Sequence, residues 1–162
     1  MTIKLKNKDM LIFEDFKLKC CIGLNGIKSK KAEGDKSTPK GLFTLGKIYY
    51  RPDRVKKPKT NIFLKKITKK MGWCDDPNSK YYNSEIKINK RIKCEKLFRH
   101  DYKYNYLLVI NYNLKKIRSK GSAIFIHLTK NYQPTAGCIA LKEKDFLILI
   151  KLINKNTKIN II

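Results

Sequence analysis

The chain is short of acidic residues and of long apolar runs. Asp and Glu number 13 against 38 Lys and Arg, which gives a formal net charge of +25 over 162 residues. No stretch approaches the ~18 consecutive apolar residues of a membrane span, so we expect no transmembrane helix. Residues 1–20 also lack the apolar core of a secretory signal. We therefore expect an export route not visible in the chain, an omitted leader, or a substrate that is met inside the cell.

Metal-binding patterns are also missing. The chain has two histidines and no CxxC pair, so we predict no zinc site, no other metal and no cofactor. A bridge between the neighbouring Cys20 and Cys21 would be strained. Reduced thiols are our starting expectation, but the sequence leaves open the disulfide state of four cysteines, Cys20, Cys21, Cys74 and Cys94.

The positive charge is spread along the whole chain. Lysine greatly exceeds arginine, and Ile, Asn and Lys are abundant while Ala, Gly and Arg are few, as an AT-rich genome would impose. Compositional drift in an AT-rich genome is therefore our preferred explanation of the positive charge. We expect no specific nucleic-acid partner. Attraction to an anionic polymer and dedicated nucleic-acid binding remain as alternatives.

The chain length and the apolar patterns predict one mainly β domain over residues 1–162. The length suits a single core, and the sequence has no long linker, repeat or low-complexity tail. Apolar residues at Phe146, Leu149 and Ile150, which follow the i, i+3, i+4 rule, predict a largely buried helix near the C-terminus. Alternating and β-branched runs predict strands at residues 2–6, 10–22, 42–50, 106–112, 122–128 and 159–162.

The segment 122–141 carries the best candidates for catalysis. An apolar run delivers His127, a polar loop follows, and Ala136-Gly137-Cys138 then precedes a second apolar run. A thiol is mostly protonated at pH 7, so a catalytic cysteine needs a neighbouring base, and histidine is the usual one. The backbone N–H groups of Ala136, Gly137 and Cys138 would be candidates for an oxyanion hole. A packed thiol and a structural histidine would explain the same residues without catalysis.

These residues resemble the catalytic motif of the L,D-transpeptidase (YkuD-like) family, in which a strand-end histidine is followed by a loop, a small residue, glycine and the catalytic cysteine. The resemblance implies that Cys138 is the nucleophile, that His127 is its base and that the main-chain carbonyl of Leu128 orients the imidazole. The commonest form of the motif has a histidine and an arginine where this chain has Ala136 and Ala140. A variant subgroup carries Ala-Gly-Cys-Ile/Val-Ala-Leu, as found here.

A second stretch, from Glu33 to Leu45, resembles the same family. It contains the pattern Gly-Asp-x-x-Thr-Pro-x-Gly-x-Phe, which in that family lies upstream of the catalytic motif and borders the substrate groove. Tyr-Arg-Pro-Asp-Arg at 50–54 and Gly-Trp-Cys-Asp-Asp-Pro at 72–77 resemble segments of the variant subgroup, without an assigned role. A turn and a strand would explain the individual residues. Two patterns in the expected order favour membership of the family.

Three further residues are predicted to line the substrate groove, namely Thr135, Trp73 and Asp75. Trp73 is the only tryptophan and lies beside two acids, a combination that could contact an amine or amide of a substrate. Packing and turn chemistry would explain it equally well. His100 could be a second site histidine, but we prefer a surface position for it.

The resemblance implies a β-sandwich-like L,D-transpeptidase domain with a helix after the cysteine. It implies that Cys138 attacks an L,D-peptide bond of a peptidoglycan stem peptide and passes the acyl group, through a thioester, to an amine. Water in place of the amine would make an L,D-carboxypeptidase or amidase of the same fold. A decayed site on a basic binding module is the third hypothesis. The family substrate implies the cell envelope or periplasm, whereas the stem type and the oligomeric state stay open.

Overall fold

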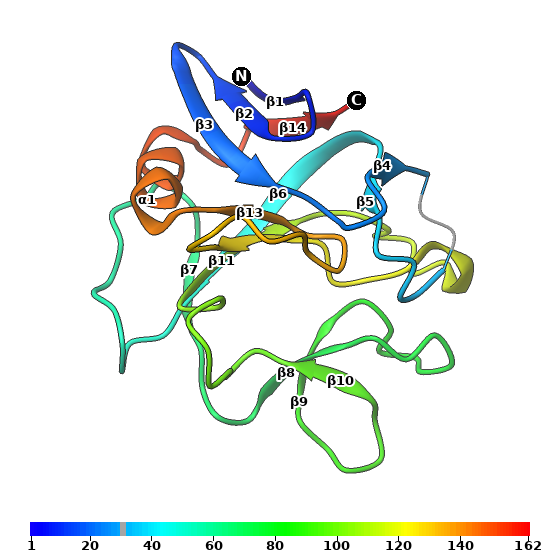
Figure 1. Cartoon of the computed structure of the whole chain (residues 1–162). Helices are drawn as coiled ribbons and strands as arrows, with labels where there is room; N and C mark the ends of the chain where they lie inside the picture. Colours follow the sequence, from blue (N-terminus) through cyan, green and yellow to red (C-terminus); the bar gives the residue numbers. More distant parts are fainter. Residues whose placement is uncertain (30–31) are drawn as a thin grey trace.

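Strands form most of the regular structure (Figure 1). The computed structural model describes residues 1–29 and 32–162. The strands of this part are β1 (Thr2–Lys6), β2 (Met10–Phe13), β3 (Phe16–Cys21), β4 (Ile27–Lys28), β5 (Thr38–Pro39), β6 (Gly41–Tyr50), β7 (Leu64–Lys66), β8 (Met71–Cys74), β9 (Glu85–Lys87), β10 (Cys94–Lys96), β11 (Tyr106–Ile110), β12 (Phe125–Leu128), β13 (Ile139–Leu141) and β14 (Lys158–Ile161). The helical segments are the 3-10 helix η1 (Arg118–Lys120) and α1 (Glu143–Leu152). Neither has the length and apolar character needed to cross a bilayer.

The main sheet folds back on itself. Within the described residues, nine strands follow the order β11-β12-β13-β3-β2-β1-β14-β6-β7, and β11 also pairs with β6. The sheet therefore has two facing layers that are continuous with each other, and the prediction of a mainly β, sandwich-type fold is confirmed. β1 and β14 pair in parallel, which brings the first and the last strand of the chain side by side (Figure 1).

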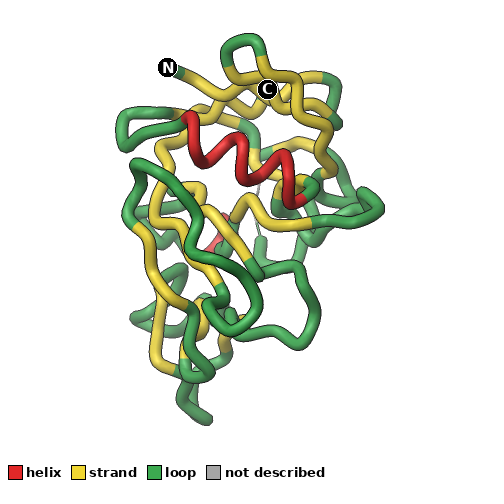
Figure 2. Tube along the Cα trace, turned by 90° about the vertical axis from the view of Figure 1, so that its left-hand side faces the viewer, coloured by secondary structure: helices red, strands yellow, loops and turns green. Residues whose placement is uncertain are grey.

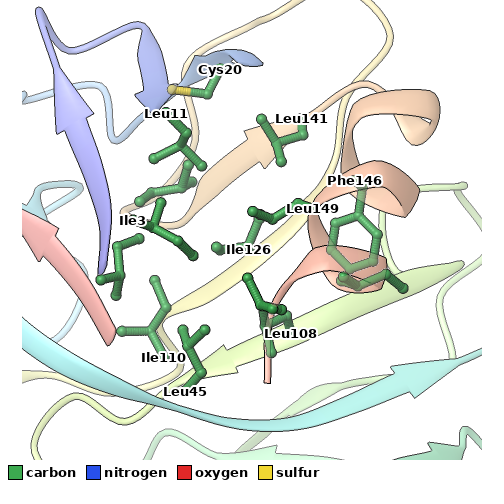
Figure 3. Packing of buried hydrophobic residues seen from close by; sticks show 14 of the residues in the cluster. Ile3, Leu11, Cys20, Leu45, Leu108, Ile110, Ile126, Leu141, Phe146 and Leu149 are labelled. Carbon is green, nitrogen blue, oxygen red and sulfur yellow. The ribbon is translucent and has the colours of Figure 1, made fainter. Parts of the chain in front are cut away.

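Apolar side chains from both layers and from α1 fill the interior (Figure 3). Ile3, Leu108 and Ile126 come from the sheet and are completely buried, as are Phe146 and Leu149 of α1. Figure 2 shows α1 lying across the strands, and Phe146, Leu149 and Ile150 of this helix belong to the core. Each such side chain contributes about 1.5–3 kcal/mol of burial free energy. The predicted helix after the cysteine is confirmed.

A second apolar cluster lies on the other face of β11 and β12. Because successive side chains of a strand alternate, Leu107, Val109 and Phe125 point away from the main core and pack here. The small sheet β10-β8-β9 lies next to this face in Figure 1, and Met71 of β8 packs into the cluster. β11 and β12 are therefore buried on both faces, and Cys138 belongs to this second cluster.

Two of the predicted strands were wrong in extent. Residues 10–22 form the hairpin β2–β3 and not one strand, because Glu14 turns the chain with a left-handed φ of 52°. The run 122–128 is a strand only from Phe125, since Ala123 has a φ of 55°. The other predicted strands lie within a few residues of their expected bounds.

Candidate active site

A cavity of about 740 Å³ opens beside the end of β12 and the turn that precedes β13. Its wall also includes residues of β10 and of the loops before β11 and β12. The predicted site residues in its lining are Asp75, His127, Leu128, Thr135, Ala136 and Cys138. Tertiary structure therefore brings together residues that are up to 63 positions apart, from Asp75 to Cys138.

His127 is held as a neutral base at the end of β12. Its Nδ1 lies 3.0 Å from the carbonyl oxygen of Leu128, the atom predicted to orient it. A carbonyl can only accept, so Nδ1 carries the proton and Nε2 keeps its lone pair. Burial lowers the pKa of His127 to about 4, although the Leu128 carbonyl acts in the opposite direction, and Lys103 adds to the lowering. The imidazole is therefore neutral at pH 7, as a general base requires.

Cys138 directly precedes β13, the strand that pairs with β12 and its His127. β13 pairs in parallel with β12 in a register that sets Cys138 beside Phe125. The Cys138 Sγ is 3.3 Å from the Phe125 backbone nitrogen and 3.3 Å from the carbonyl oxygen of Ala123, to which the thiol donates. Side chains of in-register residues project from the same face of a parallel pair, so Cys138 and His127 share a face. Both line the cavity.

The turn before Cys138 is held by the hydroxyl group of Thr135. Its Oγ1 accepts a hydrogen bond from the Gly137 N–H at 3.1 Å and donates to the Cys138 carbonyl at 2.5 Å. Gly137 has a φ of 135°, which a residue with a side chain rarely adopts. An oxyanion would therefore compete with the Thr135 hydroxyl for the Gly137 N–H, one of the three donors expected from the sequence.

A buried threonine of the upstream motif supports the same turn. The Thr38 hydroxyl accepts from the Gly23 N–H at 2.9 Å and donates to the Gly137 carbonyl at 2.9 Å. A Cβ at Gly23 would lie 2.6 Å from the Lys36 carbonyl oxygen and 3.0 Å from the Gly137 Cα, so only glycine fits there. The two family-like stretches of the sequence are thus in direct contact. Sequence reasoning gave Thr38 no such role, because the contact spans 99 positions.

Acidic side chains line one side of the cavity. Asp75 and Glu95 both lie there, and burial raises the pKa of each carboxyl group. Asp75 Oδ1 is buried without a hydrogen-bond partner among the described residues, whereas Glu95 accepts a hydrogen bond from the Tyr104 hydroxyl. A buried carboxyl oxygen without a donor favours a ligand that brings one. Within residues 1–29 and 32–162, these acids form no group with His or Cys that could hold a metal ion.

Trp73 packs against a neighbouring aromatic ring, unlike the other predicted groove residues, Thr135 and Asp75. Its ring lies edge-on to Phe125 with centroids 5.1 Å apart, and its Nε1 donates to Asn83 Oδ1 at 3.0 Å. It is not among the described residues of the cavity lining. Its ring packs β8 against β12 and its only polar atom is used by Asn83, so contact between Trp73 and substrate stays a prediction.

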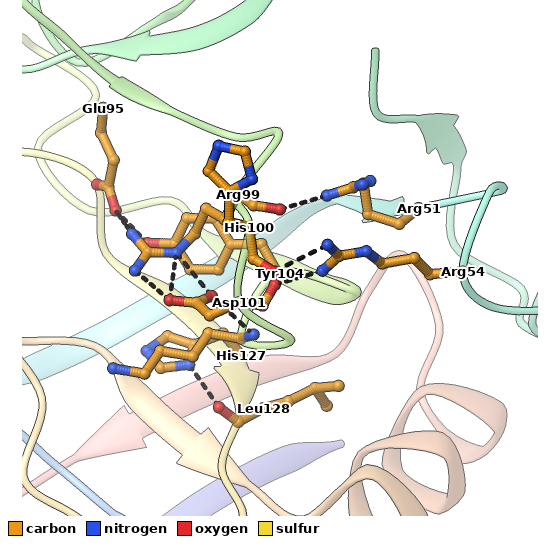
Figure 4. A network of polar contacts seen from close by, with 10 residues as sticks. Arg51, Arg54, Glu95, Arg99, His100, Asp101, Tyr104, His127 and Leu128 are labelled. Atoms are coloured by element: carbon orange, nitrogen blue, oxygen red, sulfur yellow. Dashed lines mark hydrogen bonds and ion pairs between the residues drawn. The ribbon is translucent and has the colours of Figure 1, made fainter. Parts of the chain in front are cut away.

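Arg51 fixes the segment that leads into β11 (Figure 4). Its guanidinium group is almost completely buried and donates to both carboxylate oxygens of Asp53, at 2.8 and 2.7 Å. It stacks on the ring of Phe98 at 3.4 Å and donates to the carbonyl of Arg99 at 2.6 Å. The segment 50–54, which had no role assigned from the sequence, therefore supports the cavity wall.

Arg54 continues this contact along the chain. It donates to the carbonyls of His100 and Asp101, at 2.8 and 2.7 Å, so three consecutive carbonyls are held by two arginines (Figure 4). The Arg99 guanidinium pairs with the Asp101 carboxylate at 2.5 Å and holds the pKa of Asp101 below its usual range. Arg99 lines the cavity, whereas His100 is exposed, as preferred from the sequence.

The fold and this cavity define a mainly β domain in which a thiol and a neutral imidazole share one wall. The family model of the L,D-transpeptidase catalytic domain (YkuD) matches residues 2–161. The chain therefore belongs to the L,D-transpeptidase catalytic domain family, and the resemblance inferred from the sequence is confirmed. No curated protein matches the chain at a significant level.

Two solved structures share the fold. Both are crystal structures of the helical cell shape determining protein Pgp2 from Campylobacter jejuni, and one of them is of a mutant. Each is 21% identical to this chain, with a TM-score of 0.53. The alignment covers 99% of this chain but 46% of the other, so the chain spans less than half the length of these proteins. At this identity the similarity concerns the fold alone.

Proposed function

We propose that this domain is a cysteine-dependent L,D-transpeptidase that acts on peptidoglycan stem peptides. Cys138 is the nucleophile and His127 is its general base. The observation that carries the proposal is the hydrogen bond of His127 Nδ1 to the Leu128 carbonyl, because it directs the basic Nε2 away from the backbone. Membership of the L,D-transpeptidase family supports the reaction class.

The thiol is activated during the reaction and not before it. With the pKa of His127 lowered to about 4 by burial, a resting thiolate–imidazolium pair is disfavoured. His127 Nε2 instead takes the thiol proton as Cys138 Sγ attacks the carbonyl carbon of the L-residue. The imidazolium then gives this proton to the nitrogen of the departing D-amino acid as the C–N bond breaks. The product of this half-reaction is a thioester on Cys138.

The second half-reaction reverses these roles. An amine of a second stem peptide attacks the thioester, His127 accepts the amine proton, and Cys138 leaves as the thiol. Each tetrahedral intermediate carries an oxyanion, for which the N–H groups of the turn 136–138 are the proposed donors. If water takes the place of the amine, the same residues perform a carboxypeptidase reaction.

Charged groups of the cavity suit a stem peptide, which carries both carboxylates and amines. Arg99 and Lys103 line the cavity on the side of the segment before β11, and Asp75 lies among the acids of its wall. Ala136 and Ala140, where the common family motif has a histidine and an arginine, also line it and bring no charge. We propose that Arg99 and Lys103 attract the substrate carboxylates and that Asp75 Oδ1 accepts a hydrogen bond from a substrate N–H.

Product analysis tests the proposal. The purified protein, its Cys138→Ala variant and a Cys20→Ala control are incubated with a disaccharide-tetrapeptide, and the products are identified by mass spectrometry. Cys20 is a matched control because it is a buried thiol of the main core. We expect a cross-linked dimer from the parent protein and from Cys20→Ala, and none from Cys138→Ala.

Other outcomes change the assignment. Tripeptide and free D-alanine without dimer, dependent on Cys138, would make the domain an L,D-carboxypeptidase. Cleavage of a preformed cross-link would indicate an amidase of the same fold. If neither the parent protein nor Cys138→Ala forms any product from several stem types, a binding module with a decayed site would be favoured.

A further inference from the structure

Two cysteines face each other across the small sheet beside the cavity. Cys74 on β8 and Cys94 on β10 are register partners in an antiparallel pair, and both are free thiols in this structure. We propose that Cys74 and Cys94 form a reversible disulfide that fixes the acidic wall of the cavity.

The backbone pairing sets the two residues at a closely spaced position. The N–H of Cys74 donates to the Ser84 carbonyl, and the Cys74 carbonyl accepts from the Asn83 N–H, both on the β9 side. The N–H and C=O of one strand residue point the same way, so neither group of Cys74 is directed at β10. Cys74 and Cys94 are therefore a non-hydrogen-bonded pair, with Cα atoms typically about 4.5 Å apart. Disulfides need roughly 4.4–6.8 Å between Cα atoms, so the backbone does not have to move.

A glycine leaves room for the sulfur atom to turn. A Cβ at Gly72 would lie 2.8 Å from the Sγ of Cys94 and 3.3 Å from its Cβ, so the sulfur lies over this glycine. Rotation about the Cα–Cβ bond carries the sulfur from Gly72 towards Cys74 on the same strand. Cys94 is partly exposed whereas Cys74 is completely buried, so a small oxidant reaches Cys94 first.

Thiol–disulfide exchange with a low-molecular-weight disulfide, such as oxidised glutathione, supplies the bond. The Cys94 thiolate attacks one sulfur of the oxidant, whose S–S bond breaks and releases one glutathione thiolate. The Cys74 thiolate then attacks the Cys94 sulfur and releases the second. The protons lost by the two cysteines are taken up by the two glutathione thiolates, so the protein loses two hydrogen atoms and the oxidant gains them.

The neighbours of these cysteines connect the bond to the cavity. Asp75, Lys93 and Glu95 all line the cavity wall. Because side chains alternate along a strand, they project from the face opposite Cys74 and Cys94. The disulfide thus stays outside the cavity and ties together the strands that form its wall. One consequence rests on the proposed function. We expect oxidation to lower the KM for the stem peptide about threefold, because the disulfide holds the cavity wall in place before the substrate binds.

Mass spectrometry of the full chain tests the disulfide. The protein carries Cys138→Ala, which removes the cavity thiol and leaves four of the five cysteines. After treatment with oxidised glutathione and alkylation, we expect two free thiols, a mass about 2 Da lower before alkylation, and tryptic peptide 71–80 linked to peptide 94–96. The Tm should rise by about 5 °C and return on reduction.

Control variants define what would overturn the proposal. Adding Cys94→Ser should abolish the linked peptide and the change in Tm, whereas adding Cys20→Ala should leave both intact. Four persistent thiols, or a bond involving Cys20 or Cys21 in place of Cys74 and Cys94, would overturn it. These readouts need no turnover, so they stand even if the protein proves inactive. Conversely, an active protein that never forms the bond would contradict only this inference.

Discussion

At the scale of single residues, the site depends on where a few protons and hydrogen bonds are placed. The Leu128 carbonyl fixes which nitrogen of His127 is basic, and burial keeps that nitrogen unprotonated at neutral pH. The Thr135 hydroxyl joins the N–H of Gly137 to the carbonyl of Cys138 and so sets the shape of the turn. Each of these contacts can be removed by a change of one functional group.

The depressed pKa of His127 predicts a pH dependence of both activity and stability. Since the pKa is about 4 in the folded protein and 6.5 is the ordinary value, kcat/KM should hold its value down to about pH 5 and fall near pH 4. Between pH 6.5 and 4 the unfolded chain binds a proton that the folded protein does not. Stability should therefore fall over this window, by on the order of 3 kcal/mol.

Thermal unfolding and initial rates measured from pH 4 to 8 check this prediction. The His127→Gln variant should lose activity and most of the pH dependence of its Tm between pH 6.5 and 4. An activity that halves near pH 6.5 would show that the imidazole is not desolvated as described.

Removal of the Thr135 hydroxyl should affect rate more than affinity. In Thr135→Val the turn loses two hydrogen bonds, so the Cys138 sulfur and the neighbouring N–H groups are less well fixed. We expect kcat to fall about 10- to 100-fold with KM within about threefold of the parent value. Thr135→Ser, which keeps the hydroxyl, should retain most of the rate. Equal losses in the two variants would contradict this role.

At the scale of elements, the cavity is assembled from segments that are individually irregular. Asp75 after β8 and Glu95 of β10 form the acidic wall, and the segment before β11 supplies Arg99 and Lys103. That segment has little regular structure. Its carbonyl groups accept hydrogen bonds from Arg51 and Arg54, where a strand would be bonded by a neighbouring strand. The conformation of this part of the cavity wall therefore depends on the planar, multiply donating guanidinium groups of these two arginines.

The Arg51→Lys variant tests this dependence. Lysine keeps the charge but loses the two-pronged contact with Asp53 and the stacking on Phe98. We expect a Tm lower by about 5 °C and a raised KM, with little change in kcat because the Cys138 turn is held separately. Differential scanning fluorimetry and steady-state kinetics measure these effects. The exposed Arg118, replaced by lysine, is the control and should behave like the parent protein.

At the scale of the whole molecule, the net charge of +25 is a property of the surface more than of the site. The fold buries two apolar clusters on either side of β11 and β12, and most lysines remain outside them. Such a surface attracts polyanions over distances set by the salt concentration. The cavity itself carries both signs of charge, so the attraction should be general and not selective.

Binding to a simple polyanion checks this. The affinity for poly-L-glutamate should fall at least about tenfold between 50 and 300 mM NaCl, and neutral dextran should not bind. Random double-stranded DNA should show the same salt dependence, without preference for sequence. Sequence-selective binding that persists at 300 mM NaCl would instead support a dedicated nucleic-acid function. Fluorescence anisotropy at several salt concentrations measures both.

The sequence alone determined the family, the mainly β class and the helix after the cysteine, because local patterns record strand alternation, helical spacing and a short motif. It also identified His127 and Cys138 as candidates, since residue type limits which side chains can act as base and nucleophile. Only the tertiary structure decided that Thr38 supports the cysteine turn, that Trp73 packs against Phe125 and that Cys74 faces Cys94. These facts depend on strand register and on contacts between residues far apart in the chain. Neither strand register nor a long-range contact can be read from a local sequence pattern. A shift of one residue in register would move every side chain of a strand to the opposite face of the sheet.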